Sequence, residues 1–242
     1  MPRLTLAVII PTYNEAGTIA ETLHGIFSVF AEAELGGWVV VVDDGSPDGT
    51  GRIVGEMAAD SYRVRLLERG RKMGIGSAYV DGFRYVLAEL DAEAIATMDA
   101  DGSHPPHLLT KMLGALERGA DVVVGSRYVE GGRWGAELGR KIVSMGANLL
   151  ARISTGYGVR DMTSGYRVYT RRAIESLQPD ILKTGYVFQV AILYEMLKRG
   201  FRVAEIPFHF TPRRAGKSKL SLSEYRAFLG WSLKTLYSRL RM

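Results

Sequence analysis

The chain has 242 residues, of which 47% are hydrophobic and 24% are charged, with a formal net charge of +5 and no cysteine. This composition is typical of a globular protein with one large domain, or one domain plus an appendage. The absence of thiols excludes disulfides, thiolate metal sites and a cysteine nucleophile. Any metal must therefore be bound by oxygen or imidazole, which favours a hard cation such as Mg²⁺ or Mn²⁺.

The positive charge is concentrated at the end of the chain. Residues 213–242 hold eight Lys and Arg against one acid, Glu224, so the residues before them are slightly acidic overall. No stretch approaches the roughly 18 consecutive apolar residues that a membrane-spanning helix needs. The first apolar run leads straight into a polar motif without a small-residue cleavage site. We therefore expect a cytoplasmic protein that does not cross a bilayer.

Strands and helices are expected to alternate over the first 125 residues. Apolar runs rich in β-branched residues predict strands at 4–10, 38–42, 63–67, 94–98 and 121–124. Helical periodicity predicts helices at 17–31, 49–59, 75–90 and 105–118. This alternation is typical of an α/β fold with a doubly wound, mostly parallel sheet flanked by helices. The continuously apolar runs at 39–42 and 122–124 indicate strands that are covered on both faces.

The pattern changes in the second half of the chain. The Gly-rich segment 129–135 is typical of a loop, and it is followed by an expected helix at 137–154 and a turn at 156–158. A helix at 186–199, a strand at 201–210 and a helix over about the last twenty residues complete the prediction. We divide the chain into a main domain, 1–212, and a basic loop with a C-terminal amphipathic helix, 213–242.

The last helix is expected to carry one apolar stripe, because apolar residues recur there at three- and four-residue spacing. The ordinary interpretation is a helix that packs this stripe onto the domain. Phe228 and Trp231 widen the apolar face, and the other face is almost purely cationic, which favours a helix lying on an anionic membrane surface. The stripe consists of Leu222, Tyr225, Leu229, Leu233, Leu236 and Leu240.

Polar motifs follow three of the expected strands, where ligands collect in parallel sheets. They are Pro11-Thr-Tyr-Asn-Glu15, Asp43-Asp-Gly-Ser-Pro-Asp-Gly49 and Asp99-Ala-Asp101. Each motif by itself is typical of a turn or a helix cap. Two carboxylates two residues apart repel each other unless a cation lies between them, so the last motif predicts a divalent metal that bridges to a diphosphate. Asp43 and Asp44 are expected to accept hydrogen bonds from a base and a ribose.

Other nucleotide-binding patterns are missing or weaker. The first turn lacks Gly-x-Gly-x-x-Gly, and no Gly-x-x-x-x-Gly-Lys-Ser/Thr occurs, so the dinucleotide-binding and P-loop interpretations are disfavoured. Lys72, Gly74 and Gly76 predict a loop that opens a helix, where a diphosphate can meet the helix N-terminus; an ordinary turn is the alternative. His104 and His107 follow the Asp pair, but we do not assign them as metal ligands.

Six motifs are spread along the chain. They are Pro11-Thr-Tyr-Asn-Glu15, Val42-Asp-Asp-Gly-Ser-Pro-Asp-Gly-Thr50, Met98-Asp-Ala-Asp-Gly-Ser-His-Pro-Pro106, Gly125-Ser-Arg-Tyr128, Arg140-Lys-Ile-Val-Ser144 and Asp161-Met-Thr-Ser-Gly-Tyr-Arg167. In this order they resemble a known family, the inverting family 2 glycosyltransferases of GT-A fold, and within it the dolichol- or polyprenol-phosphate mannose synthases. The resemblance covers nearly the whole chain.

The resemblance implies an inverting transfer of mannose from GDP-mannose to a dolichyl or polyprenyl phosphate. It implies that Asp99 and Asp101 bind Mg²⁺ or Mn²⁺; relatives carry Gln or Ser where this chain has Ser103, to which no metal contact is assigned. The implied nucleotide-sugar site consists of Pro11, Tyr13, Glu15, Asp43, Asp44, Ser46, Lys72, Gly74 and Asp99. The implied acceptor-phosphate site consists of Arg127, Arg140, Ser144 and Arg213, and the implied catalytic residues are Asp101, Arg127, Arg140 and Arg213.

This chemistry needs no general base. A phosphate monoester carries roughly −1.5 to −2 charges at neutral pH and is already a nucleophile, so the enzyme has to position it beside an anionic donor. Arginine side chains and a divalent ion meet that need. On the residues alone, a solvated helix face for Arg140 and a surface ion pair for Arg127 are equally good interpretations. Asp161, Arg167 and Gln189 are expected to support the acceptor site, and residues 213–219 to close over the phosphates as a loop.

Two alternatives remain open at this stage. One is a polyprenyl-phosphate glycosyltransferase that uses UDP-glucose or another UDP-sugar, because such relatives share nearly all these motifs. The other is a non-catalytic nucleotide-sugar-binding subunit of a membrane complex. The presence of Asp99, Asp101, Arg127 and Arg213 argues against it. We expect a peripheral protein on the cytoplasmic face of a membrane, with a possible small membrane-spanning partner and no nucleic-acid partner.

Overall fold

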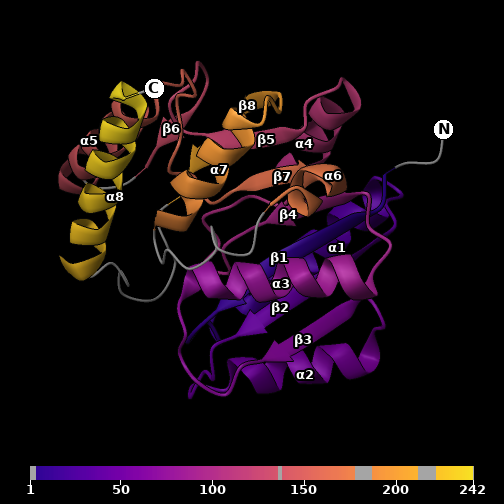
Figure 1. The fold of residues 1–242 in the computed structure, drawn as a ribbon. Coiled ribbons are helices and arrows are strands. Elements are labelled where there is room, and N and C mark those ends of the chain that lie inside the picture. Colours follow the sequence, from indigo (N-terminus) through magenta and orange to yellow (C-terminus); the bar gives the residue numbers. More distant parts are fainter. Residues whose placement is uncertain (1–3, 136–137, 178–186, 212–221, 242) are drawn as a thin grey trace.

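A seven-stranded sheet forms the centre of the molecule (Figure 1). The computed structural model describes residues 4–135, 138–177, 187–211 and 222–241. The strand order is β3-β2-β1-β4-β7-β5-β8, in which β7 runs antiparallel to both neighbours and every other adjacent pair is parallel. The strands are β1 Leu6–Thr12, β2 Gly37–Asp43, β3 Val64–Glu68, β4 Ala94–Thr97, β5 Val122–Ser126, β7 Arg167–Thr170 and β8 Val203–Pro207.

The helices confirm the α/β alternation predicted for the first 125 residues, and the ends of these strands and helices differ from the prediction by at most three residues. Short α6 was not predicted, because it directly continues β7. The helices are α1 Ile19–Glu32, α2 Thr50–Asp60, α3 Ile75–Glu89, α4 Leu108–Glu117, α5 Leu138–Thr155, α6 Arg171–Glu175, α7 Phe188–Lys198 and α8 Leu222–Leu240.

Helices cover both faces of the sheet, and the side chains of β1 contribute to two separate hydrophobic cores. Leu6, Val8 and Ile10 pack with residues of α1, α2 and α4 on one face. Ala7 and Ile9 point the other way and pack with α3, α6 and α7. All five side chains are fully buried. Successive side chains of a strand alternate between faces, so a strand that is covered on both sides is apolar throughout, as the sequence indicated.

The expected strand at 201–210 is two strands in different sheets. β8 pairs with β5 and ends at Pro207, which has no N–H to donate to a ladder. After Phe208, the strand β9 (His209–Phe210) pairs with β6 (Arg133–Trp134) in a separate two-stranded sheet. The Gly-rich segment 129–135, predicted to be a loop, therefore contains a short strand.

Helices α5 and α8 lie side by side on one flank of the molecule (Figure 1). On α8, the predicted stripe residues Tyr225, Leu229, Leu233 and Leu240 are exposed, and Leu236 is half-buried. Our expectation that Phe228 and Trp231 widen this apolar face is wrong, because both side chains pack against the core that contains α7. The helix therefore docks through one face and leaves another apolar face open.

Two further predictions concern membranes and the basic loop. In the part of the chain that the structure describes, none of the helices combines the length and hydropathy of a membrane-spanning segment. The predicted loop at 213–219 lies outside the described residues. The boundary between residues 212 and 213 stays a prediction.

Gly82 provides a stability test of the contact between α3 and β1. A Cβ atom at this position would lie 2.5 Å from Cγ2 of Ile9, a buried and stiff side chain. We expect Gly82→Ala to lower the free energy of unfolding by about 1–3 kcal/mol. Gly114→Ala in α4 is the control: its Cβ would approach only Nη1 of Arg118, at 3.4 Å. That change should be neutral or stabilise by roughly 0.5–1 kcal/mol. Equal denaturant midpoints for the two variants would contradict this account of the contact.

Candidate active site

A cleft of about 120 Å³ lies where β1, β2 and β4 end. Because these strands are parallel, the motifs that follow them meet at one edge of the sheet. Seven of the nine residues predicted for the nucleotide sugar line the cleft, together with Asp101. Glu224 of α8 also lines it and was not predicted. The seven are Pro11, Tyr13, Glu15, Asp44, Lys72, Gly74 and Asp99.

Asp43 and Ser46, the other two predicted residues, form part of the frame behind the cleft. The Thr12 hydroxyl donates to Oδ1 of Asp43 at 2.7 Å, and the N–H of Ser46 donates to Oδ2 at 2.8 Å. The N–H of Asn14 in turn donates to the hydroxyl of Ser46 at 3.0 Å. These bonds tie the end of β1 to the end of β2. Direct contact of either residue with a nucleotide stays a prediction.

Asp44 holds the loop that precedes α3. Its Oδ1 pairs with the guanidinium of Arg69, whose Nε lies 2.7 Å away, and its Oδ2 accepts from the N–H groups of Met73 (3.1 Å) and Gly74 (2.9 Å). Both members of the ion pair have only 6% of the side chain exposed. Arg69 also bonds Asp81 of α3. Arg69 was not predicted from the sequence. The signal that could have found it is a cation directly after β3, since a buried carboxylate such as Asp44 requires a partner.

The loop fixed in this way places a cation at the cleft. Nζ of Lys72 lies 4.5 Å from the centroid of the Tyr13 ring, a distance suited to cation–π attraction. Both residues line the cleft. Lys72 thus contributes positive charge beside the carboxylates of Asp99 and Asp101.

His104 supports Asp99. Its Nδ1 accepts the N–H of Asp99 at 2.9 Å, so the ring proton is on Nε2, which lies 3.9 Å from Oδ2 of the same residue. Burial lowers the pKa of His104, which keeps the imidazole neutral at neutral pH. The ring stacks on Tyr166 at 4.8 Å. His107 is exposed at the start of α4. Neither histidine was assigned as a ligand, and for His104 the contacts describe a supporting side chain.

The donor set at the end of β4 fits a hard divalent cation. Asp99 and Asp101 supply two carboxylates, and the buried hydroxyl of Ser103 has no hydrogen-bond partner within the described residues. Those residues contain no group of three or more acids and histidines suited to bind a metal on their own. Mg²⁺ and Mn²⁺ sites with one or two protein carboxylates take their remaining ligands from water and substrate phosphates. The residues present match that kind of site.

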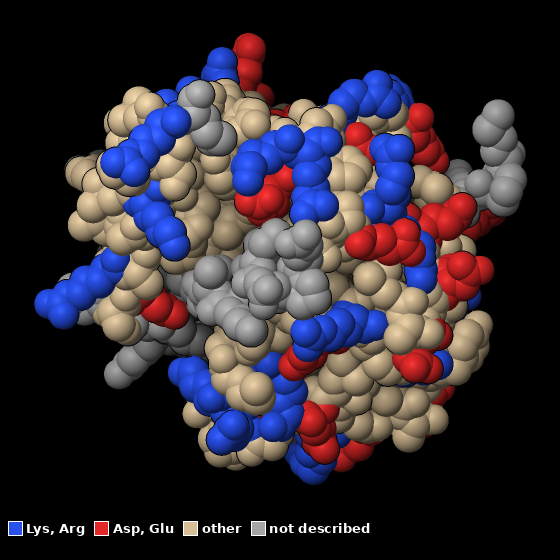
Figure 2. Space-filling model, viewed as in Figure 1, with Lys and Arg blue, Asp and Glu red and all other residues tan. Residues whose placement is uncertain are grey.

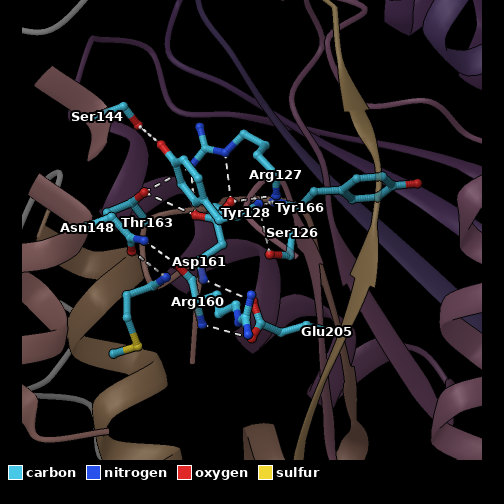
Figure 3. Close-up of polar contacts among 12 residues, drawn as sticks. Ser126, Arg127, Tyr128, Ser144, Asn148, Arg160, Asp161, Thr163, Tyr166 and Glu205 are labelled. Carbon is cyan, nitrogen blue, oxygen red and sulfur yellow. Dashed lines mark hydrogen bonds and ion pairs between the residues drawn. The ribbon is translucent and has the colours of Figure 1, made fainter. Parts of the chain in front are cut away.

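Arg127 forms a buried ion pair with Asp161 (Figure 3). Its backbone N–H and Nε donate to Oδ2 of Asp161 at 3.0 and 2.7 Å, and Nη2 donates to Oδ1 at 2.7 Å. Asp161 is fully buried, and 9% of the Arg127 side chain is exposed. The guanidinium also lies 4.2 Å from the centroid of a Trp134 ring. This pair is buried rather than on the surface, and the donors Nε and Nη2 are occupied.

Neighbouring side chains fix Asp161 in place (Figure 3). Glu205 of β8 accepts the N–H groups of Arg160 and Asp161, at 2.8 and 3.0 Å. Asn148 of α5 donates to the carbonyl of Arg160 and accepts the N–H of Met162. The segment around Asp161 is therefore held by both a strand and a helix. Glu205 and Asn148 were not predicted from the sequence, because each contacts only backbone groups of residues at least twelve positions away.

Ser144 joins α5 to this cluster. Its hydroxyl lies 2.9 Å from the phenol oxygen of Tyr128, the residue after Arg127. Burial raises the pKa of Tyr128, against the opposing effect of this hydrogen bond, so the phenol is protonated at neutral pH. Arg140 lies one turn earlier on α5, but its side chain is outside the described residues, as is Arg213. The structure thus brings together two of the four predicted acceptor residues.

Gly165 lies between the cleft residue Asp99 and the segment that carries Asp161, the partner of Arg127. A Cβ atom there would lie 3.2 Å from Nε2 of Gln189 and 3.9 Å from Oδ1 of Asp99. Its carbonyl accepts the Thr97 hydroxyl of β4 at 2.8 Å. Fully buried Arg167 donates to the carbonyls of Gln189 and Met162, at 2.6 and 2.8 Å. The Asp99 carboxylate therefore adjoins the segment that carries Asp161.

Known proteins resemble this chain over most of its length. The family description Glycosyl transferase family 2 matches residues 7–178. The chain is 37% identical to a polyprenol monophosphomannose synthase of Mycolicibacterium smegmatis, over 93% of this chain and 84% of the relative. It is 39% identical to an undecaprenyl-phosphate mannosyltransferase of Micrococcus luteus, over 90% of this chain and 88% of the relative.

Solved structures show the same fold. One is the crystal structure of glucosyl-3-phosphoglycerate synthase from Mycobacterium tuberculosis with Mn²⁺, UDP and glucosyl-3-phosphoglycerate. It matches with a TM-score of 0.66 and 24% identity, over 98% of this chain and 80% of that chain. The mostly parallel sheet flanked by helices is therefore a GT-A fold. The family match and the curated relatives show that the chain is a glycosyltransferase and belongs to glycosyl transferase family 2.

Proposed function

We propose that this enzyme transfers mannose from GDP-mannose to the phosphate of a dolichyl or polyprenyl lipid, with inversion at the anomeric carbon. The relatives whose names describe mannosyl transfer to polyprenyl phosphates support the acceptor and the sugar. The observation that carries the proposal is the junction at Gly165, where Asp99 of the cleft adjoins the segment that binds Arg127. A donor in the cleft and a phosphate near Arg127 are then neighbours.

Each group of residues has a separate task in this mechanism. Asp99 and Asp101 hold Mg²⁺ or Mn²⁺, which when bound supplies charge stabilisation for the departing diphosphate. Lys72 adds positive charge at the cleft. Asp161 and Thr163 fix Arg127, and with Arg140, Ser144 and Arg213 this arginine orients the acceptor phosphate. The phosphate oxygen attacks the anomeric carbon opposite the leaving diphosphate.

The donor base is tested by ligand protection. We expect GDP-mannose with Mn²⁺ to raise the unfolding temperature more than UDP-glucose with Mn²⁺ at equal concentration, because a ligand stabilises the state that binds it. The reverse order would replace GDP-mannose by the rival UDP-sugar and leave the acceptor assignment unaffected.

We also propose that the enzyme attaches peripherally to the cytoplasmic face of a membrane through α5 and α8. Ten of the twelve large hydrophobic side chains exposed in the described chain lie on these two helices. Their sequences contain six Lys and Arg and a single acid, Glu224. On the side of the molecule drawn in Figure 2, the surface over α8 is largely uncharged or basic. An apolar face with cationic flanks suits anionic lipid. The ten are Ile142, Val143, Met145, Leu149, Ile153, Tyr225, Leu229, Leu233, Tyr237 and Leu240.

Asp101→Asn tests the metal. We expect metal-dependent turnover to fall by about 100-fold or more, because stabilisation by the ion is worth several kcal/mol. The melting temperature should stay close to that of the native protein. Asp60→Asn, at an exposed position at the end of α2, is the control for removal of one carboxylate. Normal turnover of Asp101→Asn with Mn²⁺ would show that the metal assignment is wrong.

Arg140→Ala tests the acceptor site. A charged hydrogen bond contributes roughly 1.5–3 kcal/mol, so kcat/KM for a short-chain polyprenyl phosphate should fall about 10- to 100-fold. The affinity for GDP-mannose in a calorimetric titration should not change. Lys141→Ala, which removes the adjacent charge on α5, should leave both quantities unaffected. Loss of nucleotide affinity in Arg140→Ala would move this arginine to the donor site. Arg127→Ala is less informative, because it leaves the buried Asp161 without a partner.

The double change Leu229→Gln and Leu233→Gln tests the membrane face. Both side chains are about half exposed. Loss of their apolar contact with lipid should weaken partition onto anionic vesicles by at least about tenfold. Tyr62→Gln removes an exposed aromatic side chain from the turn before β3 and should change nothing. Deletion of α8 is a poorer test, because it also removes Phe228 and Trp231 from the core. Undiminished sedimentation of the double variant with vesicles would refute the assignment.

A further inference from the structure

A second cavity lies away from the catalytic cleft, between α5, α7 and α8. Its volume is about 380 Å³. Two basic side chains and two phenols line it, and none of the lining residues is acidic or belongs to the predicted catalytic set. The lining residues are Thr155, Gly156, Tyr157, Tyr194, Lys198 and Arg239.

Arg239 is fixed at the wall of this cavity. Its Nη1 donates to the carbonyl oxygens of Ile153 and Ser154, at 2.8 and 3.3 Å, in the last turn of α5. Carbonyls at a helix C-terminus lack partners within the helix, so the guanidinium acts as a cap. Gly156 has φ of 79°, and a Cβ atom there would lie 2.4 Å from Nη1. A side chain at this position would displace the guanidinium, and the positive φ also favours glycine. Nε and Nη2 make no hydrogen bond in the part of the chain that is described.

Lys198 and the two tyrosines supply further donors. Nζ of Lys198 lies 3.2 Å from Glu195 and 5.4 Å from the centroid of the Tyr194 ring, and 45% of the side chain is exposed. The rings of Tyr157 and Tyr194 meet edge to face at 6.1 Å. Neither phenol has a hydrogen-bond partner among the described residues. The cavity thus offers one ammonium, one guanidinium and two hydroxyl groups to an anion.

We propose that this cavity binds the phosphate of an anionic phospholipid headgroup, which deepens the proposed membrane attachment and rests on it. The apolar face of α5 and α8 begins at the cavity. Arg239 bonds the carbonyl of Ile153 and precedes Leu240, and the side chains of Ile153 and Leu240 are 52% and 74% exposed. A phospholipid whose phosphate is bound by Lys198 and Arg239 therefore has its acyl chains beside these exposed apolar side chains. A soluble phosphate has no apolar chain to contact Ile153 and Leu240, so these side chains add nothing to its binding.

The cavity is separate from the predicted acceptor site. Ser144, which bonds Tyr128 beside Arg127, lies ten residues before Ser154 on α5. At a rise of 1.5 Å per residue, the two points are roughly 15 Å apart along the helix. The lipid phosphate that reacts and the phosphate that this cavity binds are therefore different molecules. Contact at both ends of the helix pair fixes its orientation on the surface.

The test compares two lysine substitutions on vesicles. Partition is measured on vesicles of phosphatidylcholine with phosphatidylglycerol, for the native chain, Lys198→Gln and Lys234→Gln. Lys234 is exposed on α8 and does not line the cavity. General attraction to an anionic surface predicts a loss of about fivefold for either change. A headgroup site predicts that partition falls tenfold or more for Lys198→Gln, while Lys234→Gln shows no more than the general loss. On pure phosphatidylcholine the three proteins should behave alike, and melting temperatures check the fold.

Three results would overturn the proposal or separate it from the proposed function. Equal losses of vesicle partition for Lys198→Gln and Lys234→Gln would show only general attraction to an anionic surface and would overturn the headgroup site. Glycerol 3-phosphate binding in solution that depends on Lys198, with vesicle partition unchanged in Lys198→Gln, would assign the cavity to a soluble phosphate. Transfer to a short-chain soluble acceptor is measured separately and should be the same in Lys198→Gln and the native enzyme. If the native enzyme fails there, the proposed transfer is wrong, and the vesicle comparison still decides on the cavity.

Discussion

Crowding of negative charge at one edge of the sheet is the constraint on which the rest of the site depends. Parallel strands bring Asp43, at the end of β2, and Asp44, directly after it, to the same edge of the sheet as Asp99 and Asp101 after β4. Like charges in a partly buried cleft repel one another, and an anionic donor would add to the repulsion. The fold satisfies the first pair internally, Asp43 by hydroxyl and N–H donors and Asp44 by Arg69. Asp99 and Asp101 line the cleft together with Glu15 and Glu224, so a divalent cation held by the second pair would offset negative charge where an anionic donor has to bind.

Charge balance also limits the part that Arg127 can play in attracting a phosphate. Its charge is balanced by the fully buried Asp161, and two of its three nitrogens already donate to protein oxygens. A balanced pair attracts an anion only weakly at a distance, but it offers the remaining nitrogen, Nη1, in a fixed position. Long-range attraction for the acceptor has to come from other cations, for which Arg140 and Arg213 are the proposed candidates. Arg127 then contributes mainly orientation.

The sequence predicted what depends on local periodicity and missed what depends on distant partners. The β/α alternation up to residue 125 needs only the period of apolar residues, and it was predicted within three residues. Strand β7 has four residues, and its partners on β4 lie seventy or more positions earlier, so no local pattern marks it. Arg69 looks like an ordinary surface cation until Asp44 is placed beside it. On α8 the stripe was found, but the docked side was misjudged. The small residues Ser232 and Thr235 are buried, which indicates close helix packing rather than an apolar seam.

Helix α8 carries part of the proposed membrane contact and runs from the catalytic cleft to the C-terminal end of α5. In its first turn Glu224 lines the catalytic cleft, and in its last turn Arg239 caps α5. A helix of 19 residues is roughly 28 Å long, so these two fixed points span much of one flank. Phe228 and Trp231 dock the helix between them. In the proposed attachment, α8 lies on lipid through its other face and would set the height of the cleft above the headgroups. A lipid phosphate that stays at headgroup level can then meet the donor without leaving the bilayer, which is why the orientation of α5 and α8 matters for transfer as well as for attachment.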